Sequence, residues 1–102
     1  MSRSVTVVRH TAKPGKRDEV LRIWEKYVRD YVAGHDSSLG YYYCFDDNDP
    51  DTIIAIQVTA DRDAGQEFVK QPWFGDYQRE TLELVAGQSE VRTATPQWIK
   101  GA

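Results

Sequence analysis

Runs of β-branched residues and stretches with a helical period alternate along the chain, and each change of pattern predicts a new element. Residues 5–12 and 52–59 are rich in Val, Ile and Thr, which favours strands. Over residues 17–33 the apolar positions recur at three- and four-residue spacing, which predicts one amphipathic helix that ends at Gly34. The apolar positions of this helix are Val20, Ile23, Trp24, Tyr27, Val28 and Tyr31.

A hairpin and a short helix are predicted in the middle of the chain. Residues 39–45 predict a strand, and the acidic run 46–51 connects it to the next strand. That run lacks the Gly and the later Glu of a calcium-binding loop, so we interpret it as a solvated hairpin turn without a metal. Asp61 or Asp63 can cap a short helix that reaches Val69.

The remaining pattern predicts a second long helix and a last strand. A Gln-Pro pair interrupts the helical pattern, a helix follows over residues 73–85 with Gly87 as its stop, and residues 90–98 predict the final strand. The order βαββαβ is that of a ferredoxin-like α+β fold with a four-stranded antiparallel sheet. We expect it to form a single domain over residues 1–102.

Apolar residues on both faces of a strand predict that both faces of the sheet are covered. Both alternating sets of residues 52–59 are largely apolar, whereas a half-exposed sheet shows one polar set. The helices can cover only one face, so we expect a homodimer through the other sheet face. Arg9 and Arg92 sit on strands where charge is unexpected. They predict ion pairs with Glu90 at the dimer interface or, alternatively, contact with an anionic substrate group.

The composition of the chain limits its partners and its location. The net charge of −3 and the absence of a basic run lead us to expect no nucleic-acid binding. Cys44 is the single cysteine, which excludes an internal disulfide. No apolar stretch approaches the roughly 18 residues of a membrane span, so we expect a cytoplasmic protein without membrane contact. The sequence shows no His/Cys cluster typical of a metal site.

Two histidines are candidates for proton transfer near neutral pH. His10 shares one face of its strand with Thr6 and Val8, and we expect this face to point toward the helices. There, His10 could act as a general base. The alternative is a core or interface histidine held by a hydrogen bond. His35 follows the first helix and is interpreted as a surface-loop residue.

Aromatic residues make up 12% of the chain, which is typical either of a pocket for a flat ligand or of a small core built from large side chains. Residues 41–43 are consecutive tyrosines, so Tyr42 must point to the opposite face from its two neighbours. One face of the last helix can form an aromatic lid over the sheet or simply pack in the core. This face carries Trp73, Phe74 and Tyr77.

Four segments resemble the antibiotic-biosynthesis-monooxygenase, or quinol-monooxygenase-like, family. Residues 5–16 are similar to its opening strand and Lys-Pro-Gly-Lys turn, and residues 39–41 to the start of its second strand. Residues 49–52 resemble its hairpin, and residues 71–74 resemble the break before its last helix. In this order and spacing, the resemblance covers nearly the whole chain.

The resemblance implies a dimeric α/β barrel with a pocket between the helices and the sheet of each subunit. It also implies that the pocket can oxidise a quinol or polyketide phenol with dioxygen and without a cofactor, as some members do. In such a pocket, His10 and Tyr77 are candidate catalytic residues. The candidate substrate-binding residues are Tyr41, Tyr43, Phe68, Trp73 and Phe74.

Several positions depart from the family pattern. Ala55 stands where the polyketide-tailoring members carry an Asn, Thr59 where many members carry a Trp, and Phe68 where many carry a His. Val8 replaces an Asn of the haem-degrading members, which disfavours that activity. The sequence therefore supports two hypotheses: a cofactor-independent monooxygenase acting on a small phenolic or quinol substrate, and a non-catalytic dimeric module that binds or senses a small aromatic metabolite.

Overall fold

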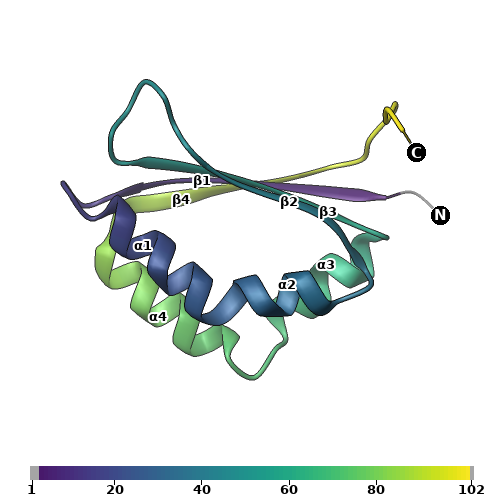
Figure 1. Ribbon diagram of the computed structural model, residues 1–102, viewed down its shortest axis with the longest axis horizontal. Coiled ribbons are helices and arrows are strands. Elements are labelled where there is room, and N and C mark those ends of the chain that lie inside the picture. Colours follow the sequence, from purple (N-terminus) through teal and green to yellow (C-terminus); the bar gives the residue numbers. More distant parts are fainter. Residues whose placement is uncertain (1–2, 102) are drawn as a thin grey trace.

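The computed structural model describes residues 3–101 and contains a four-stranded antiparallel sheet with helices on one of its faces (Figure 1). The strands are β1 (Ser4–Ala12), β2 (Ser38–Phe45), β3 (Thr52–Thr59) and β4 (Val85–Ala94), in the spatial order β2-β3-β1-β4. Between β1 and β2 the chain forms α1 (Arg17–Trp24), η1 (Glu25–Arg29) and α2 (Asp30–Gly34). Between β3 and β4 it forms α3 (Arg62–Val69) and α4 (Phe74–Leu84). The predicted ferredoxin-like βαββαβ fold is confirmed.

The helix predicted over residues 17–33 contains a π-helical turn, η1, at its centre. A π turn inserts an extra residue into the helical ladder and rotates the side chains that follow it. Trp24, just before the turn, packs 5.2 Å from the Tyr41 ring on β2. Tyr27 and Tyr31 pack instead against Trp73, at the start of α4. The spacing of the apolar residues predicted the helix. It did not predict that side chains before and after the π turn pack against two different elements, because that depends on the tertiary structure.

The last strand differs from the predicted range 90–98. It begins at Val85, whose backbone pairs with Ala12 of β1, so α4 passes into β4 without a loop. Gly87, which was expected to stop the helix, has a φ of +74° and lies where the β4 register on β1 shifts. Glycine adopts this φ without a steric penalty. The prediction was wrong because a glycine in a bulge and a glycine after a helix give the same sequence signal.

The hairpin and the cap of the short helix agree with the sequence predictions. β2 and β3 pair antiparallel on either side of residues 46–51. Asp61, rather than Asp63, caps α3, because its carboxylate accepts a 2.8 Å hydrogen bond from the Ala64 amide. This cap satisfies one of the backbone donors that the first turn of a helix leaves free.

The hydrophobic core occupies one end of the layer between the sheet and the helices. Ala12, Val20 and Ile53 are almost completely buried there, and three partly buried side chains pack against them: Tyr43, Phe45 and Leu84. Burial of each large aliphatic side chain contributes about 1.5–3 kcal/mol to folding. On β3 the inward positions alternate with outward ones, and the inward set continues from Ile53 to Ala55, Gln57 and Thr59.

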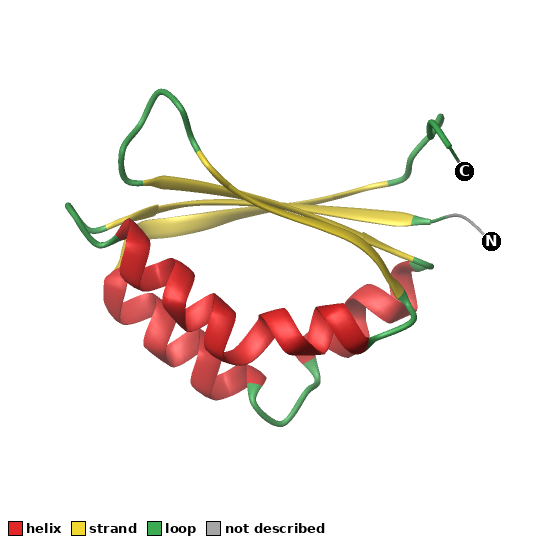
Figure 2. Ribbon diagram, viewed as in Figure 1, coloured by secondary structure: helices red, strands yellow, loops and turns green. Residues whose placement is uncertain are grey.

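Within residues 3–101, no helix lies on the other face of the sheet (Figure 2). We call it the open face; its central side chains are Val7, Tyr42, Ile54, Ile56 and Val58. Arg9 lies on the same face, directly opposite Glu90 in the β1–β4 pairing. Tyr42 is 67% exposed there, which confirms that it points away from its two neighbouring tyrosines. Within residues 3–101, no helix is both long and apolar enough to cross a membrane.

Candidate functional site

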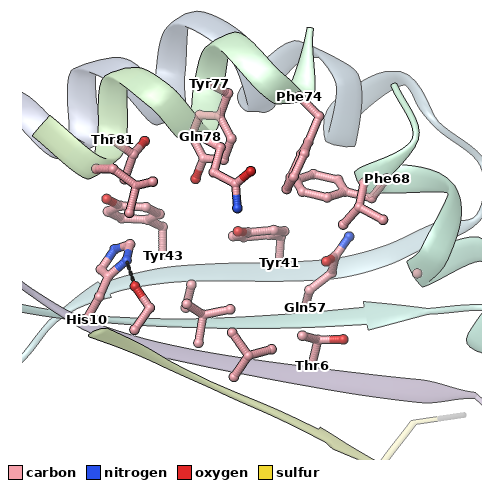
Figure 3. Close-up of a pocket in the computed structure, with 17 residues that line it drawn as sticks. Thr6, His10, Tyr41, Tyr43, Gln57, Phe68, Phe74, Tyr77, Gln78 and Thr81 are labelled. Carbon is pink, nitrogen blue, oxygen red and sulfur yellow. Dashed lines mark hydrogen bonds between the residues drawn. The ribbon is translucent and has the colours of Figure 1, made fainter. Parts of the chain in front are cut away.

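A cavity of about 240 Å³ lies between the inner face of the sheet and the helices α3 and α4 (Figure 3). All four strands contribute to its floor, and the two helices form its roof. Three apolar side chains at its edge are largely exposed: Val69 (51%), Leu82 (59%) and Val91 (61%). The cavity therefore opens between these helices and β4, while its floor on β3 is buried.

His10 lies in the floor of the cavity, on the inner face of β1 with Thr6 and Val8, as predicted. Its Nδ1 is 3.4 Å from the Ser89 hydroxyl, a long hydrogen bond. The β4 bulge that contains Gly87 shifts the register at this point and places Ser89 beside the histidine. Burial lowers the pKa of His10 from its ordinary value of 6.5. The imidazole is therefore neutral at pH 7 and has a lone pair available to accept a proton.

Tyr41 and Tyr43 also point into the cavity, from β2. The Trp24 indole Nε1 donates a 3.1 Å hydrogen bond to Tyr41 Oη, and the Trp24 ring packs 4.9 Å from that of Tyr43. Burial raises the pKa of Tyr41, and the hydrogen bond from Trp24 offsets part of that rise. Burial also raises the pKa of Tyr43, so both phenols stay protonated at neutral pH.

Two buried hydroxyls in the cavity wall have no hydrogen-bond partner within residues 3–101: Tyr43 Oη and Thr81 Oγ1. A buried hydroxyl without a partner costs about 1–3 kcal/mol. The two residues line opposite sides of the cavity, Tyr43 from the sheet and Thr81 from α4 (Figure 3), whereas their oxygen atoms are enclosed behind its wall. Burial raises the pKa of Tyr77, also on α4, and the nearby Thr81 hydroxyl offsets part of that rise, although the two groups do not meet the geometry of a hydrogen bond. Tyr77 is therefore a protonated phenol at neutral pH. A ligand oxygen in the cavity can reach the Tyr43 and Thr81 hydroxyls only after their side chains rotate toward it.

The roof of the cavity is aromatic. Phe68 from α3 and Phe74 from α4 meet edge to face with ring centroids 5.7 Å apart, and Phe74 lies 6.0 Å from the Tyr77 ring. This geometry is one of the favoured arrangements for aromatic pairs. Trp73 does not line the cavity; it packs behind Phe68, at 5.6 Å, and against Tyr31, at 5.4 Å. Among the predicted site residues, Trp73 is thus the one that the fold directs elsewhere.

The structure adds polar residues that the sequence reasoning missed. Gln57, Gln78 and Thr81 line the cavity, as does Ser89. Gln57 could have been found from the alternation on β3, because it is a polar residue in the inward set and is only 8% exposed. Ser89 could not have been found in this way, since its position depends on the bulge.

The positions that depart from the family pattern now have definite places. Val8, Ala55 and Phe68 line the cavity and present only apolar surface to it. Thr59 points elsewhere, and its hydroxyl donates a 2.8 Å hydrogen bond to the Asp61 carbonyl, beside the α3 cap. No group of three or more His, Cys, Asp or Glu side chains in the described part of the chain is placed to hold a metal ion.

Comparison with known proteins agrees with this fold. Residues 4–80 match the model of the family described as antibiotic biosynthesis monooxygenase. Rv0793 from Mycobacterium tuberculosis superposes with a TM-score of 0.86 and 15% identity, over 98% of this chain and 100% of that chain. SnoaB, a cofactor-independent oxygenase from Streptomyces nogalater, superposes with a TM-score of 0.83 and 18% identity over the full length of both chains.

A third solved structure, protein SO0527 from Shewanella oneidensis, has a TM-score of 0.83 and 18% identity, over 93% of this chain and 91% of that chain. No curated protein sequence matches the chain significantly. At these identities the solved structures establish a shared fold, while the family match rests on the sequence of residues 4–80.

Proposed function

The chain belongs to the antibiotic biosynthesis monooxygenase family, and we propose that it oxidises a small phenolic or quinol substrate with dioxygen and without a cofactor. The observation that carries the proposal is the neutral histidine in the floor of an aromatic cavity, with the hydroxyls of Tyr43 and Thr81 just behind the cavity wall. Hydrogen-bond donors of this kind stabilise a phenolate in a site with little water.

Five steps account for every atom of such a reaction. His10 takes the proton of the phenolic hydroxyl, and the phenolate then gives one electron to dioxygen. The resulting superoxide and substrate radical combine at an unsubstituted ring carbon, and the peroxide takes the proton back from His10. Loss of the remaining hydrogen of that carbon, with cleavage of the O–O bond, releases water and leaves a carbonyl. The net change is one CH₂ of the keto tautomer plus O₂ giving one C=O plus H₂O.

The cavity residues suit three roles in these steps. His10 is neutral because of burial, so its lone pair is available to the phenol. Tyr43, Tyr77 and Thr81 supply hydroxyl donors, and the high pKa of both tyrosines keeps their protons in place. Phe68 and Phe74 supply ring surface against which a flat substrate can stack.

The second candidate function is a module that binds a small aromatic metabolite without turnover. It is favoured by the apolar side chains of Val8, Ala55 and Phe68, which line the cavity where other members of the family carry polar groups. The two candidates share the ligand class and differ only in the chemistry that follows binding.

Oxygen uptake with anthrone separates the two functions. Anthrone has one reactive CH₂, so the enzyme should consume one O₂ per molecule and form anthraquinone. We expect His10→Ala to lower kcat about a hundredfold or more and Tyr77→Phe to lower it at least tenfold. His35→Ala, in a loop outside the cavity, is the matched control and should leave kcat unchanged. Stabilisation of the protein by anthrone without oxygen uptake would establish the binding module instead.

We also propose that the protein is a homodimer joined through the open face. Ile54, Ile56 and Val58 give this face an apolar centre that no helix covers, which is unusual for a monomer. Arg9 and Glu90 lie opposite each other beside it, so two copies related by a twofold axis could exchange ion pairs.

A further inference from the structure

A polar group lies at the end of the cavity away from His10, and the proposed chemistry does not use it. We propose that Gln57 in the floor, with Gln78 in the roof above Tyr41, forms a second subsite that recognises an uncharged oxygen function at the far end of the ligand from its reacting phenol. This inference rests on the proposed binding of a hydroxylated aromatic molecule in the same cavity. It specifies that this molecule is uncharged, that its second polar group lies at the far end from the phenol, and that Gln57 and Gln78 recognise that group.

Gln57 belongs to the buried floor of the cavity and is not a surface side chain. It is only 8% exposed, and its amide points from β3 into the cavity (Figure 3). The side-chain hydrogen bonds of the cavity wall join Trp24 to Tyr41 and Ser89 to His10. Within residues 3–101 the Gln57 amide makes no hydrogen bond to another side chain, and it is not one of the fully enclosed polar groups that lack a partner. The amide is therefore open to the cavity, where a polar group of a ligand can complete its hydrogen bonds.

The strand register puts this amide far from the proposed reacting end. Gln57 pairs with Thr6 on β1, whereas His10 pairs with Ile53. Four residues of strand separate the two levels, which corresponds to about 13 Å along the sheet. Both side chains extend into the cavity and so occupy part of this length. A ligand of two or three fused rings would span the remaining distance between their polar atoms.

Gln78 completes the subsite from the roof. Its amide extends from α4 into the cavity above Tyr41, between the end formed by Tyr43 and Thr81 and the end formed by Gln57 (Figure 3). Gln78 is exposed at the opening, whereas Gln57 is buried in the floor. Each amide offers two N–H donors and one acceptor oxygen, so the pair can bind a hydroxyl or a carbonyl equally well.

The residues that line the cavity also indicate that the ligand is uncharged. None of the cavity-lining residues in the described part of the chain is an Asp, Glu, Lys or Arg, and His10 is neutral. A carboxylate or ammonium group would lose its hydration in the cavity without gaining an ion pair. The volume of about 240 Å³ is also below the roughly 300–1,000 Å³ of sites for drug-sized ligands, which limits the ligand to a few rings.

Binding of three naphthalene derivatives under anaerobic conditions tests the subsite without requiring turnover. The probes are 1-naphthol, 1,5-dihydroxynaphthalene and 5-hydroxy-1-naphthoate, which place hydrogen, hydroxyl and carboxylate at the far end. Isothermal titration of the full chain should give a Kd for the diol about fivefold below that for 1-naphthol. The naphthoate should bind at least tenfold more weakly than the diol.

Three variants assign the preference to its residues. Gln57→Met keeps the side-chain length and removes the amide, so it should bind 1-naphthol and the diol with equal Kd. Gln78→Met should reduce the preference for the diol by about twofold, and it serves as the test if Gln57→Met does not fold. Gln66→Met, at an exposed position of α3 outside the cavity, is the control and should keep the full preference.

The outcomes separate this inference from the proposed function. Equal binding of 1-naphthol and the diol by the unmodified protein would overturn the subsite, as would a preference that survives in both Gln57→Met and Gln78→Met. If none of the probes binds, the subsite and the proposed function both fail. If the diol preference is present and depends on the two amides while anthrone is not oxidised, the subsite stands and the monooxygenase function alone is overturned.

Discussion

Trp24 and Tyr41 are joined by a 3.1 Å hydrogen bond from the indole Nε1 to the phenol oxygen, and their rings lie 5.2 Å apart. This contact ties the end of α1 to the inner face of β2. In this bond the Tyr41 oxygen is the acceptor, whereas the Tyr43 hydroxyl, two residues further along β2, has no partner within residues 3–101. The two inward tyrosines of β2 therefore differ in their hydrogen bonding.

Replacing the indole should test this contact through stability. Trp24→Phe removes the donor and leaves the buried Tyr41 hydroxyl without its partner, so we expect the free energy of unfolding to fall by about 1–3 kcal/mol. Urea denaturation measures the change. Trp98→Phe is the control, because Trp98 is 80% exposed, and it should stay within about 0.5 kcal/mol of the unmodified protein. An equal effect of both substitutions would show that the hydrogen bond contributes nothing.

Arg17 should be important for the hairpin between β2 and β3. Its Nη1 donates to the backbone carbonyls of Asp46 (3.2 Å), Asp49 (2.9 Å) and Thr52 (3.3 Å), and its guanidinium lies 4.0 Å from the centre of the Phe45 ring. Lysine lacks the planar guanidinium that packs on the Phe45 ring while Nη1 reaches these carbonyls.

We therefore expect Arg17→Lys to lower the free energy of unfolding by about 1–2 kcal/mol in urea denaturation, with an unchanged m value. Arg22→Lys, at an exposed position of α1, should have no measurable effect. Unchanged stability of Arg17→Lys would mean that the loop carbonyls are satisfied equally well by water.

The buried His10 should make stability depend on pH. Its pKa in the folded protein is below the ordinary value of 6.5, so the unfolded chain binds the proton more readily. The stability that the neutral histidine contributes is therefore fully present above pH 6.5 and is lost as the pH falls through the pKa of the folded protein.

Between pH 7.5 and pH 5, urea denaturation should consequently show a larger fall in the free energy of unfolding for the unmodified protein than for His10→Gln, which cannot titrate. His35→Gln is the control for a histidine outside the cavity and should behave like the unmodified protein. The idea fails if the His10→Gln variant and the unmodified protein lose the same stability between the two pH values.

A charge at the centre of the open face should prevent the proposed dimer. Ile56 pairs with Val7 on one side and Tyr42 on the other, at the middle of this face. Placing a carboxylate there would bury an unpaired charge between two copies, so Ile56→Glu should sediment as a monomer at concentrations where the unmodified protein is a dimer. Gln66→Glu, on the exposed side of α3, should not change the assembly. A monomeric unmodified protein at micromolar concentration would contradict the proposal.

The local pattern of apolar and polar residues was sufficient to predict the order of helices and strands and the direction of several side chains of the site. The two-residue period of a strand predicted that Tyr41 and Tyr43 share a face and that Tyr42 does not, and it grouped His10 with the inward side chains of β1. These predictions succeeded because side-chain direction along a strand depends only on the backbone of that strand. The same two-residue alternation, applied to β3, would have identified Gln57 as an inward-pointing polar residue.

What the sequence determined by itself is therefore the order of elements, their inner and outer faces and the family of the fold, since each follows from short-range periodicity or from matching residues. The tertiary structure alone decided that Trp73 packs behind Phe68, that the β4 bulge places Ser89 beside His10, and that Tyr43 and Thr81 keep free hydroxyls around a cavity. These features depend on how elements distant in sequence pack together, and no local spacing of residues specifies such contacts.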